Sequence, residues 1–325
     1  MTLTRRSFAS AAATLAFTGI PGPVRAQSYP VRPIKIVVPI STGSTTDVIA
    51  RLIGETLRVS MGQTVLIENR PGAGGAVGSA SVAKAAPDGY TLLTVSSAHT
   101  SNPALYASLP YDTVADFNGI TMLATLPLIL VVSPAKGIRS VAELIARAKA
   151  KPGELTYSSG GIGSALHMNA EQFRAMAKFD AVHVPYRGTP EAMADVIAGR
   201  IDFAFISIGN ALPAINDGRL IALACGTERR SKSLPNVPTT VEAGVAGSSY
   251  NAWVGLFAPA STPVNILDSL NRETVKALAI PDIAQKLAAF GAEPAPMSRA
   301  AFDAYIVKEL ATIKELARVA KIPVN

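Results

Sequence analysis

Cysteine and charge are both scarce in this sequence. Its 325 residues include one cysteine, Cys225, and only 16% of them are charged. A single cysteine cannot form an internal disulfide, so the fold must be stabilised by its hydrophobic core. The hydrophobic fraction of 49% supplies such a core and excludes a disordered chain, and the length allows two domains.

Basic residues form no cluster. Residues 1–26 carry three arginines and no acidic residue, so without them the formal charge falls from +7 to +4. The remaining chain has no run of Lys or Arg interleaved with aromatic residues. We therefore expect no nucleic-acid partner.

Long hydrophobic runs are also rare, and the first one, near the N-terminus, is typical of a targeting signal. Arg5-Arg6-Ser7-Phe8 leads into an apolar run over residues 9–17, and Val24-Arg25-Ala26 follows as a small-residue cleavage site. We predict an export signal over residues 1–26, cleaved near Ala26, and a periplasmic mature protein. Residues 4–8 match the twin-arginine (Tat) pattern loosely, and the Sec route stays open as well.

The second apolar run, residues 119–132, is too short to span a bilayer and is interrupted by Pro127. It predicts one or two buried strands. No cysteine lies near the cleavage site, which excludes a lipoprotein anchor.

A hydroxyl-rich loop follows the first predicted strand, residues 34–38. We call residues 39–47 (Pro-Ile-Ser-Thr-Gly-Ser-Thr-Thr-Asp) loop 1. A helix follows it, because one helical face is apolar: Val48, Ile49, Leu52, Ile53 and Leu57. Unpaired N–H groups and the positive end of the helix dipole suit a carboxylate here.

The same residue types also occur in ordinary turns and helix caps. Asp47 or Thr46 capping the helix would explain two of them without any ligand. Loop 1 alone leaves both interpretations open.

Residues 69–78 form a glycine-rich segment between a predicted strand and a helix. A dinucleotide fingerprint starting at Gly72 requires Gly or Ala at position 77, where the chain has Val77, and no acidic residue ends a following strand. The segment therefore predicts a turn that lets the next helix pack closely, and we expect no cofactor.

Strands and helices alternate from residue 128 to residue 205. The predicted strands are 128–132, 155–158, 181–184 and 201–205, and the predicted helices are 140–149, 165–177 and 191–198. Such alternation predicts an α/β fold with a parallel sheet, helices on both faces, and ligand binding at the carboxyl ends of the strands. Beyond residue 205 strands and helices no longer alternate regularly. Strands are predicted at 220–224 and 253–258, a loop at 234–247, and helices from 262, at 283–290 and at 298–320.

A second loop repeats the chemistry of the first. Loop 2, residues 158–164 (Ser-Ser-Gly-Gly-Ile-Gly-Ser), also joins a predicted strand to a helix. His167 lies in the first turn of that helix, where the dipole disfavours a charged imidazole, so we expect it neutral and able to donate a hydrogen bond. Ser96, Ser97 and His99 end another predicted strand and are weaker candidates for the same cleft.

Enzyme signatures are mostly missing. Gly209 stands two residues after Ser207, as in the nucleophile elbow, but Phe205 stands where that motif requires another glycine. The three histidines lack metal-ligand spacing, so we expect no metal. Ser164 and His167 are three residues apart and leave a secreted hydrolase as an alternative, against a simple cap followed by a first-turn polar residue.

Several strings of the mature chain resemble one family. The strings are Tyr29-Pro30, residues 34–47, Glu68-Asn69-Arg70-Pro71-Gly72-Ala73-Gly74-Gly75, residues 86–92, Asn102-Pro103, residues 109–112, residues 183–188 and residues 234–239. They are similar to the Bug receptors, the exported solute-binding proteins of tripartite tricarboxylate transporters, over the whole mature chain.

This resemblance implies a two-lobe, type II periplasmic binding fold, each lobe a mostly parallel sheet flanked by helices. It places lobe 1 at residues 27–125 and 228–325 and lobe 2 at residues 126–227. It implies a small organic acid held between the loops, either a di- or tricarboxylate or an aromatic acid. The ligand-binding candidates are Ser41, Thr42, Gly43, Ser44, Thr45, Asp47, Gly161, Gly163, Ser164 and His167, with Ser96, Ser97, His99 and Ser207 as weaker ones.

Two positions depart from the family pattern. Gly43-Ser44 replaces the usual Gly-Gly pair, and Ser207 replaces an acid that many relatives carry, which disfavours a ligand with an ammonium group. The resemblance further implies a monomer that performs no catalysis and docks on membrane permease subunits. A receptor that signals to a sensory kinase is a further alternative.

Overall fold

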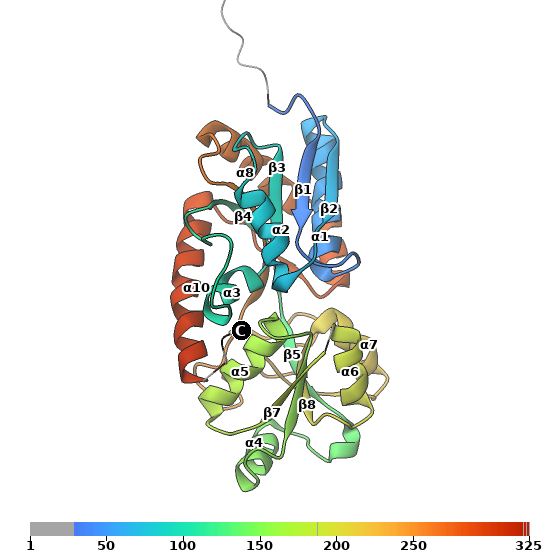
Figure 1. Cartoon of the computed structure of the whole chain (residues 1–325). Helices are drawn as coiled ribbons and strands as arrows, with labels where there is room; N and C mark the ends of the chain where they lie inside the picture. Colours follow the sequence, from blue (N-terminus) through green and yellow to red (C-terminus); the bar gives the residue numbers. More distant parts are fainter. Residues whose placement is uncertain (1–28, 187, 321, 323, 325) are drawn as a thin grey trace, which may run out of the picture.

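The computed structural model describes residues 29–186, 188–320, 322 and 324. The predicted export signal and its cleavage site therefore lie outside the described part of the chain. Two lobes, each a sheet covered by helices, lie one above the other in Figure 1. Among the described residues, no helix has both the length and the hydropathy that a bilayer span requires.

Sheet A forms the first lobe, with six strands in the order β11-β4-β10-β3-β1-β2. The strands are β1 (Ile34–Val38), β2 (Val65–Asn69), β3 (Thr91–Ser96), β4 (Phe117–Leu126), β10 (Ala252–Pro259) and β11 (Glu293–Pro294). Its helices are α1 (Thr45–Met61), α2 (Ala76–Ala83), α3 (Ala98–Leu105), α8 (Val264–Leu278), α9 (Pro281–Ala289) and α10 (Arg299–Val319). Neighbouring residues of β1 point to opposite faces: Ile36 packs with α1 and α8, and Val37 packs with α2 and α10.

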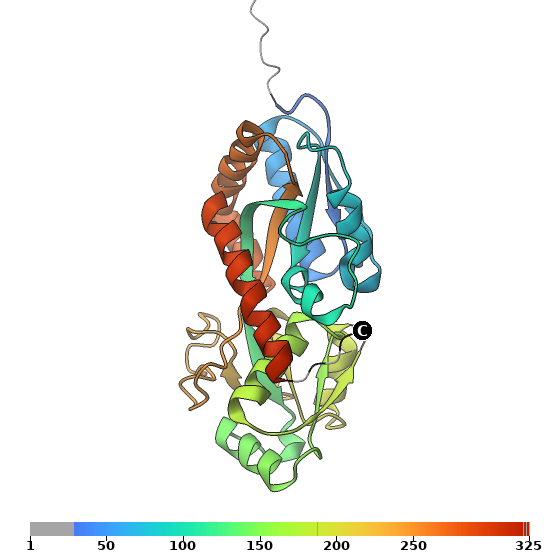
Figure 2. The same cartoon turned by 60° about the vertical axis from the view of Figure 1, so that its left-hand side comes forward.

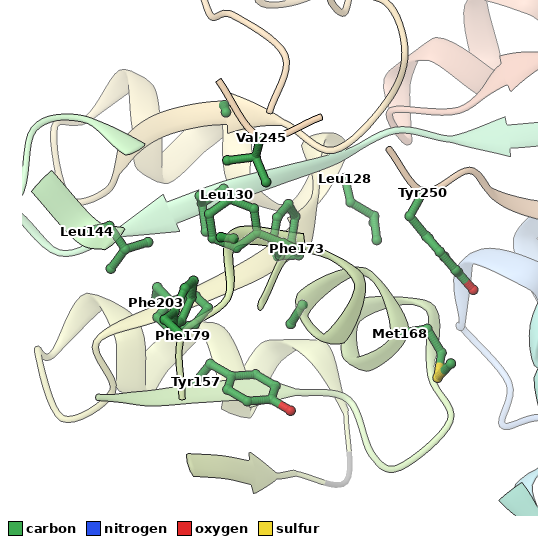
Figure 3. Close-up of a cluster of buried hydrophobic side chains, with 14 of the residues drawn as sticks. Leu128, Leu130, Leu144, Tyr157, Met168, Phe173, Phe179, Phe203, Val245 and Tyr250 are labelled. Carbon is green, nitrogen blue, oxygen red and sulfur yellow. The ribbon is translucent and has the colours of Figure 1, made fainter. Parts of the chain in front are cut away.

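Sheet B forms the second lobe, with five strands in the order β7-β6-β8-β5-β9. The strands are β5 (Leu128–Val132), β6 (Thr156–Ser159), β7 (Val182–Pro185), β8 (Phe203–Ser207) and β9 (Ile221–Cys225). Helices α4 (Val141–Ala150) and α5 (Ala165–Ala177) cover one face, and α6 (Thr189–Ile197) and α7 (Ile208–Asn216) cover the other. Phe173, Phe179 and Phe203 meet edge to face in the first of these layers, as Figure 3 shows.

The strand directions bring the carboxyl ends of both sheets to the junction of the lobes. β4 ends at Leu126, Pro127 follows, and β5 starts at Leu128 in the other lobe. β1, β2, β3 and β4 share one direction, because β10 is antiparallel to both β3 and β4 and β3 is parallel to β1. β6, β7 and β8 run against β5, so they return to the junction. Loops 1 and 2, which follow β1 and β6, therefore both lie there.

The predicted mostly parallel sheets are confirmed in strand direction, but neither sheet is purely parallel. β10 and β5 run against their neighbours because each enters its sheet from the junction, directly after a crossing between the lobes. Alternation of strands and helices carries no signal for such a crossing. The long apolar run 119–132 is indeed two buried strands, β4 and β5, on either side of Pro127.

Helix α7 was not predicted. Gly209 and Pro213 lower its intrinsic helix propensity, yet Ala211 and Ala214 bury one face against sheet B. Gly209 also makes a contact between the lobes: a Cβ on it would lie 2.3 Å from the backbone carbon of Phe290. Only a glycine allows α7 to approach the end of α9 so closely.

Helix α10 ties the two lobes together. Phe302 and Ile306, in its first half, pack in the core of sheet A, and Ile313 and Leu316, in its second half, pack with residues of sheet B. Figures 1 and 2 both show this helix running from the upper lobe onto the lower one.

Glu309, between those two halves, is a mostly buried carboxylate. Its Oε2 accepts hydrogen bonds from Thr100 Oγ1 and Trp253 Nε1, both at 2.7 Å, and its Oε1 accepts one from Tyr305. Burial raises its pKa to about 7 and outweighs these hydrogen bonds, which lower it. The side chain joins α10 to α3 and β10.

The raised pKa of Glu309 predicts a pH-dependent stability. Unfolding returns this pKa to about 4.5, so ionisation of Glu309 costs the native state stability as the pH rises from 4.5 to 7. The cost reaches about 3 kcal/mol above pH 7. Glu309→Gln keeps an acceptor for Thr100 and Trp253, so its stability relative to the wild type should rise over this pH range. Urea unfolding at pH 4.5, 6 and 8 measures this, and a stability difference that does not change with pH would contradict it.

Candidate ligand site

Loop 1 presents an exposed turn followed by a capped helix. Ser41, Thr42 and Gly43 are exposed, and Ser44 and Thr45 are half-buried. Ser44 is the N-cap of α1: its Oγ accepts a hydrogen bond from Asp47 N at 3.2 Å. The cap is therefore neither Asp47 nor Thr46, because both already lie within the helix. The hydroxyl that departs from the family pattern at Ser44 serves as this cap.

Asp47 lies beneath loop 1 with only 1% of its surface exposed. Its Oδ2 accepts from Gly43 N at 2.9 Å and from Arg51 Nε at 3.0 Å, and its Oδ1 accepts from Asn69 Nδ2 at 2.9 Å. Burial by itself would raise the pKa of Asp47, but the hydrogen bonds from Arg51, Gly43 and Asn69 hold that pKa below its ordinary value. Both carboxylate oxygens are thus engaged by the protein.

Asn69 completes the support of loop 1. Its Nδ2 also donates to Ile40 O at 3.1 Å, and its Oδ1 accepts from Arg51 Nη2 at 2.9 Å. Asn69 comes from β2, the strand next to β1, and pairs in register with Val38. The side chain therefore ties loop 1 to the neighbouring strand.

The glycine-rich segment 69–78 supports loop 1 from the other side. A Cβ on Gly78 would lie 2.7 Å from both Arg70 O and Pro39 Cβ, so α2 packs directly against the start of loop 1. Close helix packing is what the sequence predicts for these glycines, and it is confirmed.

Loop 2 has the same construction, 120 residues later in the chain. Ser164 is the N-cap of α5, with its Oγ accepting from His167 N at 3.3 Å. Gly163 N donates to His167 Nδ1 at 3.2 Å, as Gly43 N donates to Asp47. Gly43 and Gly163 both have a left-handed backbone, with φ of 81° and 77°. Each loop is therefore closed by a glycine amide that donates to the side chain four residues later.

His167 is 3% exposed, and burial, aided by nearby Arg174, lowers its pKa to about 4. The imidazole is neutral near pH 7, as expected. Because Nδ1 accepts from Gly163, the neutral ring carries its proton on Nε2, which can donate.

Ser164 and His167 do not form a nucleophile and its base. The Ser164 hydroxyl bonds to the backbone of His167, and the imidazole bonds to Gly163. This is the arrangement of a cap followed by a first-turn polar residue, so the geometry gives the hydrolase alternative no support.

The sequence analysis does not name two residues at loop 2 as site residues: Ser159 within the loop and His183 beside it. Ser159 Oγ lies 2.7 Å from His183 Nε2 and accepts from Gly161 N at 3.1 Å. His183 comes from β7, which pairs with β6. A local sequence pattern cannot show that a side chain of β7 contacts the loop that follows β6. The only signal for His183 is that residues 183–188 contribute to the family resemblance.

The weaker candidates divide into two groups. Ser96 and Ser207 end β3 and β8 at the junction of the lobes, level with the loops. Ser97 and His99 are 0% exposed. The His99 ring packs against Tyr111, Phe117 and Phe257, and burial lowers its pKa to about 4. His99 thus lies in the core of sheet A and does not face the loops.

Loop 2 lies close to the facing lobe. A Cβ on Gly163 would lie 2.8 Å from Leu105 Cδ1 of α3, so loop 2 touches lobe 1. Within the described part of the chain, no cluster of His, Cys, Asp and Glu has the arrangement of a metal site. The groups gathered around the loops are hydroxyls, backbone N–H groups and a neutral imidazole, which suit an anion with hydrogen-bond acceptors.

Comparisons with known proteins give consistent matches. A family model described as "Tripartite tricarboxylate transporter family receptor" matches residues 49–321. One relative, "UPF0065 protein in tcbD-tcbE intergenic region" of a Pseudomonas species, is 38% identical over 272 residues, covering 83% of this chain and 81% of the relative. Protein BugT of Bordetella pertussis is 37% identical over 282 residues, covering 86% of each chain.

Solved structures agree with these matches. The R. palustris protein Rpa4515 with adipate has a TM-score of 0.83 and 32% identity, covering 91% of this chain and 100% of that one. MatC of Rhodopseudomonas palustris with bound malate has a TM-score of 0.79 and 31% identity, covering 89% and 99%.

The hydrogen bonds of Asn69 predict the effect of removing it. Asn69→Ala leaves Ile40 O and one oxygen of Asp47 without this donor, so unfolding should become easier by about 1–3 kcal/mol, and the amide of Gly43 should exchange faster. Urea unfolding and amide hydrogen exchange measure the two effects. Asn118→Ala is the matched control, because Asn118 in the same sheet makes one long hydrogen bond of 3.5 Å to Pro259 O. An equal loss of stability in both variants would contradict the role of Asn69.

Proposed function

Because the chain belongs to the tripartite tricarboxylate transporter receptor family, we propose that it is a solute-binding protein that captures a small carboxylate-bearing organic acid between its lobes. The observation that carries this proposal is the pair of matching helix N-termini. Two glycine–serine turns, Gly43-Ser44 and Gly163-Ser164, open α1 and α5 at the facing ends of the two sheets. The structures of relatives with adipate and with malate support a carboxylate as the ligand.

The groups proposed to contact the acid are the exposed parts of both loops. Loop 1 offers the hydroxyls of Ser41, Thr42 and Thr45, together with its backbone N–H groups. Loop 2 offers the backbone of Gly161 and the opening turn of α5, with His167 Nε2 as a neutral donor. Ser96 and Ser207 flank these groups at the ends of their strands.

Asp47, Ser44 and Gly163 have a different proposed role. They close the two loops through their own hydrogen bonds and so fix the positions of the groups that meet the ligand. His99 is left out of the proposed site, because its ring lies in the core of sheet A.

Capture requires that the lobes move. We propose that residues 126–250 move as one lobe against the rest of the mature chain, with bending at Pro127 and near residue 251. The second boundary lies later than the expected residue 227, because Val245 and Tyr250 pack in the core of sheet B and Thr239 pairs with Cys225 of β9. The closed protein would dock on membrane permease subunits from the periplasm as a monomer, without catalysis. Two further solved structures similar to this chain support this location. One is a periplasmic transporter, with a TM-score of 0.82 and 32% identity, and the other is the periplasmic binding protein BugD, with a TM-score of 0.80 and 29% identity.

Thermal unfolding of the mature protein against a panel of acids tests the proposal. The panel contains adipate, malate, citrate and benzoate, with adipamide as the uncharged control. A ligand present at a hundredfold over its Kd adds about 2.7 kcal/mol to the folded state. A shift with an acid and none with adipamide is expected. If no acid shifts the unfolding and mass spectrometry of the denatured protein finds no bound acid, the proposal fails.

Replacing His167 by Asp separates ligand binding from folding. Aspartate at this position can accept from Gly163 N as Asp47 accepts from Gly43 N, and it suits the first turn of a helix. Aspartate and asparagine both remove the buried ring that stacks on His183, so these two variants should lose stability to a similar extent. Its negative charge would lie beside the proposed carboxylate, so the affinity should fall at least tenfold, which equals about 1.4 kcal/mol.

Calorimetric titration with the best acid of the panel measures the effect, and His167→Asn is the neutral control. Equal affinities of the Asp and Asn variants would contradict an anion at the α5 N-terminus.

A further inference from the structure

Loop 2 rests on a stack of three aromatic rings that no part of the sequence analysis assigned. Tyr157 of β6, His167 of α5 and His183 of β7 lie nearly parallel. The two imidazole centroids are 4.1 Å apart, and the Tyr157 and His183 centroids are 4.9 Å apart. Tyr157 and His167 are buried, and His183 is half-buried.

Each imidazole of the stack reaches one glycine amide of loop 2. His167 Nδ1 accepts directly from Gly163 N at 3.2 Å. His183 Nε2 lies 2.7 Å from Ser159 Oγ, and the same oxygen accepts from Gly161 N at 3.1 Å. The two glycines, two residues apart, are thus held by two stacked rings from different elements.

We propose that His183 is a positioning residue of the ligand site, which holds Gly161 through Ser159 and holds His167 through ring stacking. This inference rests on the proposed function, because it concerns the shape of the loop that meets the acid. His183 acts through other residues and is not itself placed against the ligand.

The geometry of loop 1 supports this role. There Asn69, from the strand beside β1, holds the backbone of Ile40 and the carboxylate of Asp47. In lobe 2, β7 lies beside β6 as β2 lies beside β1, and His183 comes from it. Each loop is therefore held by a polar side chain from the neighbouring strand. His183 pairs with Tyr157, one residue before the position in β6 that corresponds to Val38, the partner of Asn69.

Ser159 Oγ takes part in three hydrogen-bond contacts of loop 2. It accepts from Gly161 N at 3.1 Å, lies within donating distance of Gly161 O at 3.1 Å, and lies 2.7 Å from His183 Nε2. Its single proton goes either to Gly161 O, with Nε2–H of His183 donating to the oxygen, or to an unprotonated Nε2. In both arrangements His183 holds the hydroxyl oxygen that accepts from Gly161.

Charged and titratable neighbours agree with a neutral pair. His183 and His167 face each other, Glu171 and Arg174 of α5 form an ion pair beside them, and the Tyr157 hydroxyl bonds to Glu171. Burial, with the neighbouring His167 as a second cause, lowers the pKa of His183 to about 3, although Glu171 opposes this shift. Loop 2 should therefore keep its shape at every pH above about 5.

Three variants of the mature protein test the inference. His183→Phe keeps a ring in the stack and removes Nε2, and Ser159→Ala removes the other end of the hydrogen bond. The double variant completes a double-mutant cycle. Asn69→Ala serves as the reciprocal control, because it loosens loop 1 instead. Amide hydrogen exchange at Gly43, Gly161 and Gly163 is compared with that of a core amide, Val131, which corrects for global stability.

We expect the amides of Gly161 and Gly163 to exchange at least tenfold faster in His183→Phe while Gly43 does not change, and the opposite pattern in Asn69→Ala. The Kd for the best acid of the panel should rise about threefold to tenfold in each single variant of loop 2. The double variant should be no weaker than either single variant, because both remove the same interaction. Nitrogen NMR of the imidazoles should show His183 neutral from pH 8 to pH 5.

A change at Gly161 no larger than that at Val131 would overturn the inference, as would additive effects in the cycle. If the wild type binds no acid at all, the proposed function fails, and the exchange and NMR measurements still decide whether His183 positions loop 2.

Discussion

One hydrogen bond, made twice, underlies the candidate site. In each lobe the N–H of a left-handed glycine donates to a side chain in the first turn of the following helix, Asp47 for Gly43 and His167 for Gly163. This bond closes the turn between the strand and the helix in each lobe. Both turns need a glycine at the left-handed position and a serine cap directly after it.

The two turns differ in charge. The carboxylate of Asp47 already offsets the positive end of the α1 dipole, whereas neutral His167 leaves the α5 dipole uncompensated. A carboxylate bound in the proposed site would therefore be attracted more strongly by lobe 2, and lobe 1 would add hydroxyls. Each loop is also supported by a network of its own type. In lobe 1 this is the Arg51–Asp47 ion pair together with Asn69, and in lobe 2 it is the stack of neutral rings.

The directions of the strands explain why both turns lie at the junction of the lobes. The chain crosses between lobes at Pro127 and again between β9 and β10, and each crossing strand enters its sheet from the junction. All strands that run against a crossing strand must then end at the junction. Helix α10 packs on both lobes and adds a third connection, with Glu309 joining it to α3 and β10.

Much of this was determined by sequence alone. Apolar runs, glycine stops and serine caps are local signals, so the strands around loops 1 and 2, the helices after them and the resemblance to the receptor family could be predicted. The tertiary structure decided what the local pattern cannot contain. Asn69 and His183 reach the loops only because β2 and β7 lie beside β1 and β6, and Ser159 of loop 2 meets His183 for the same reason. His99 follows a strand as the site residues do, but the strand and helix around it turn its ring into the core. Register and packing bring residues together across long stretches of chain, and no local spacing records which neighbour a strand will have.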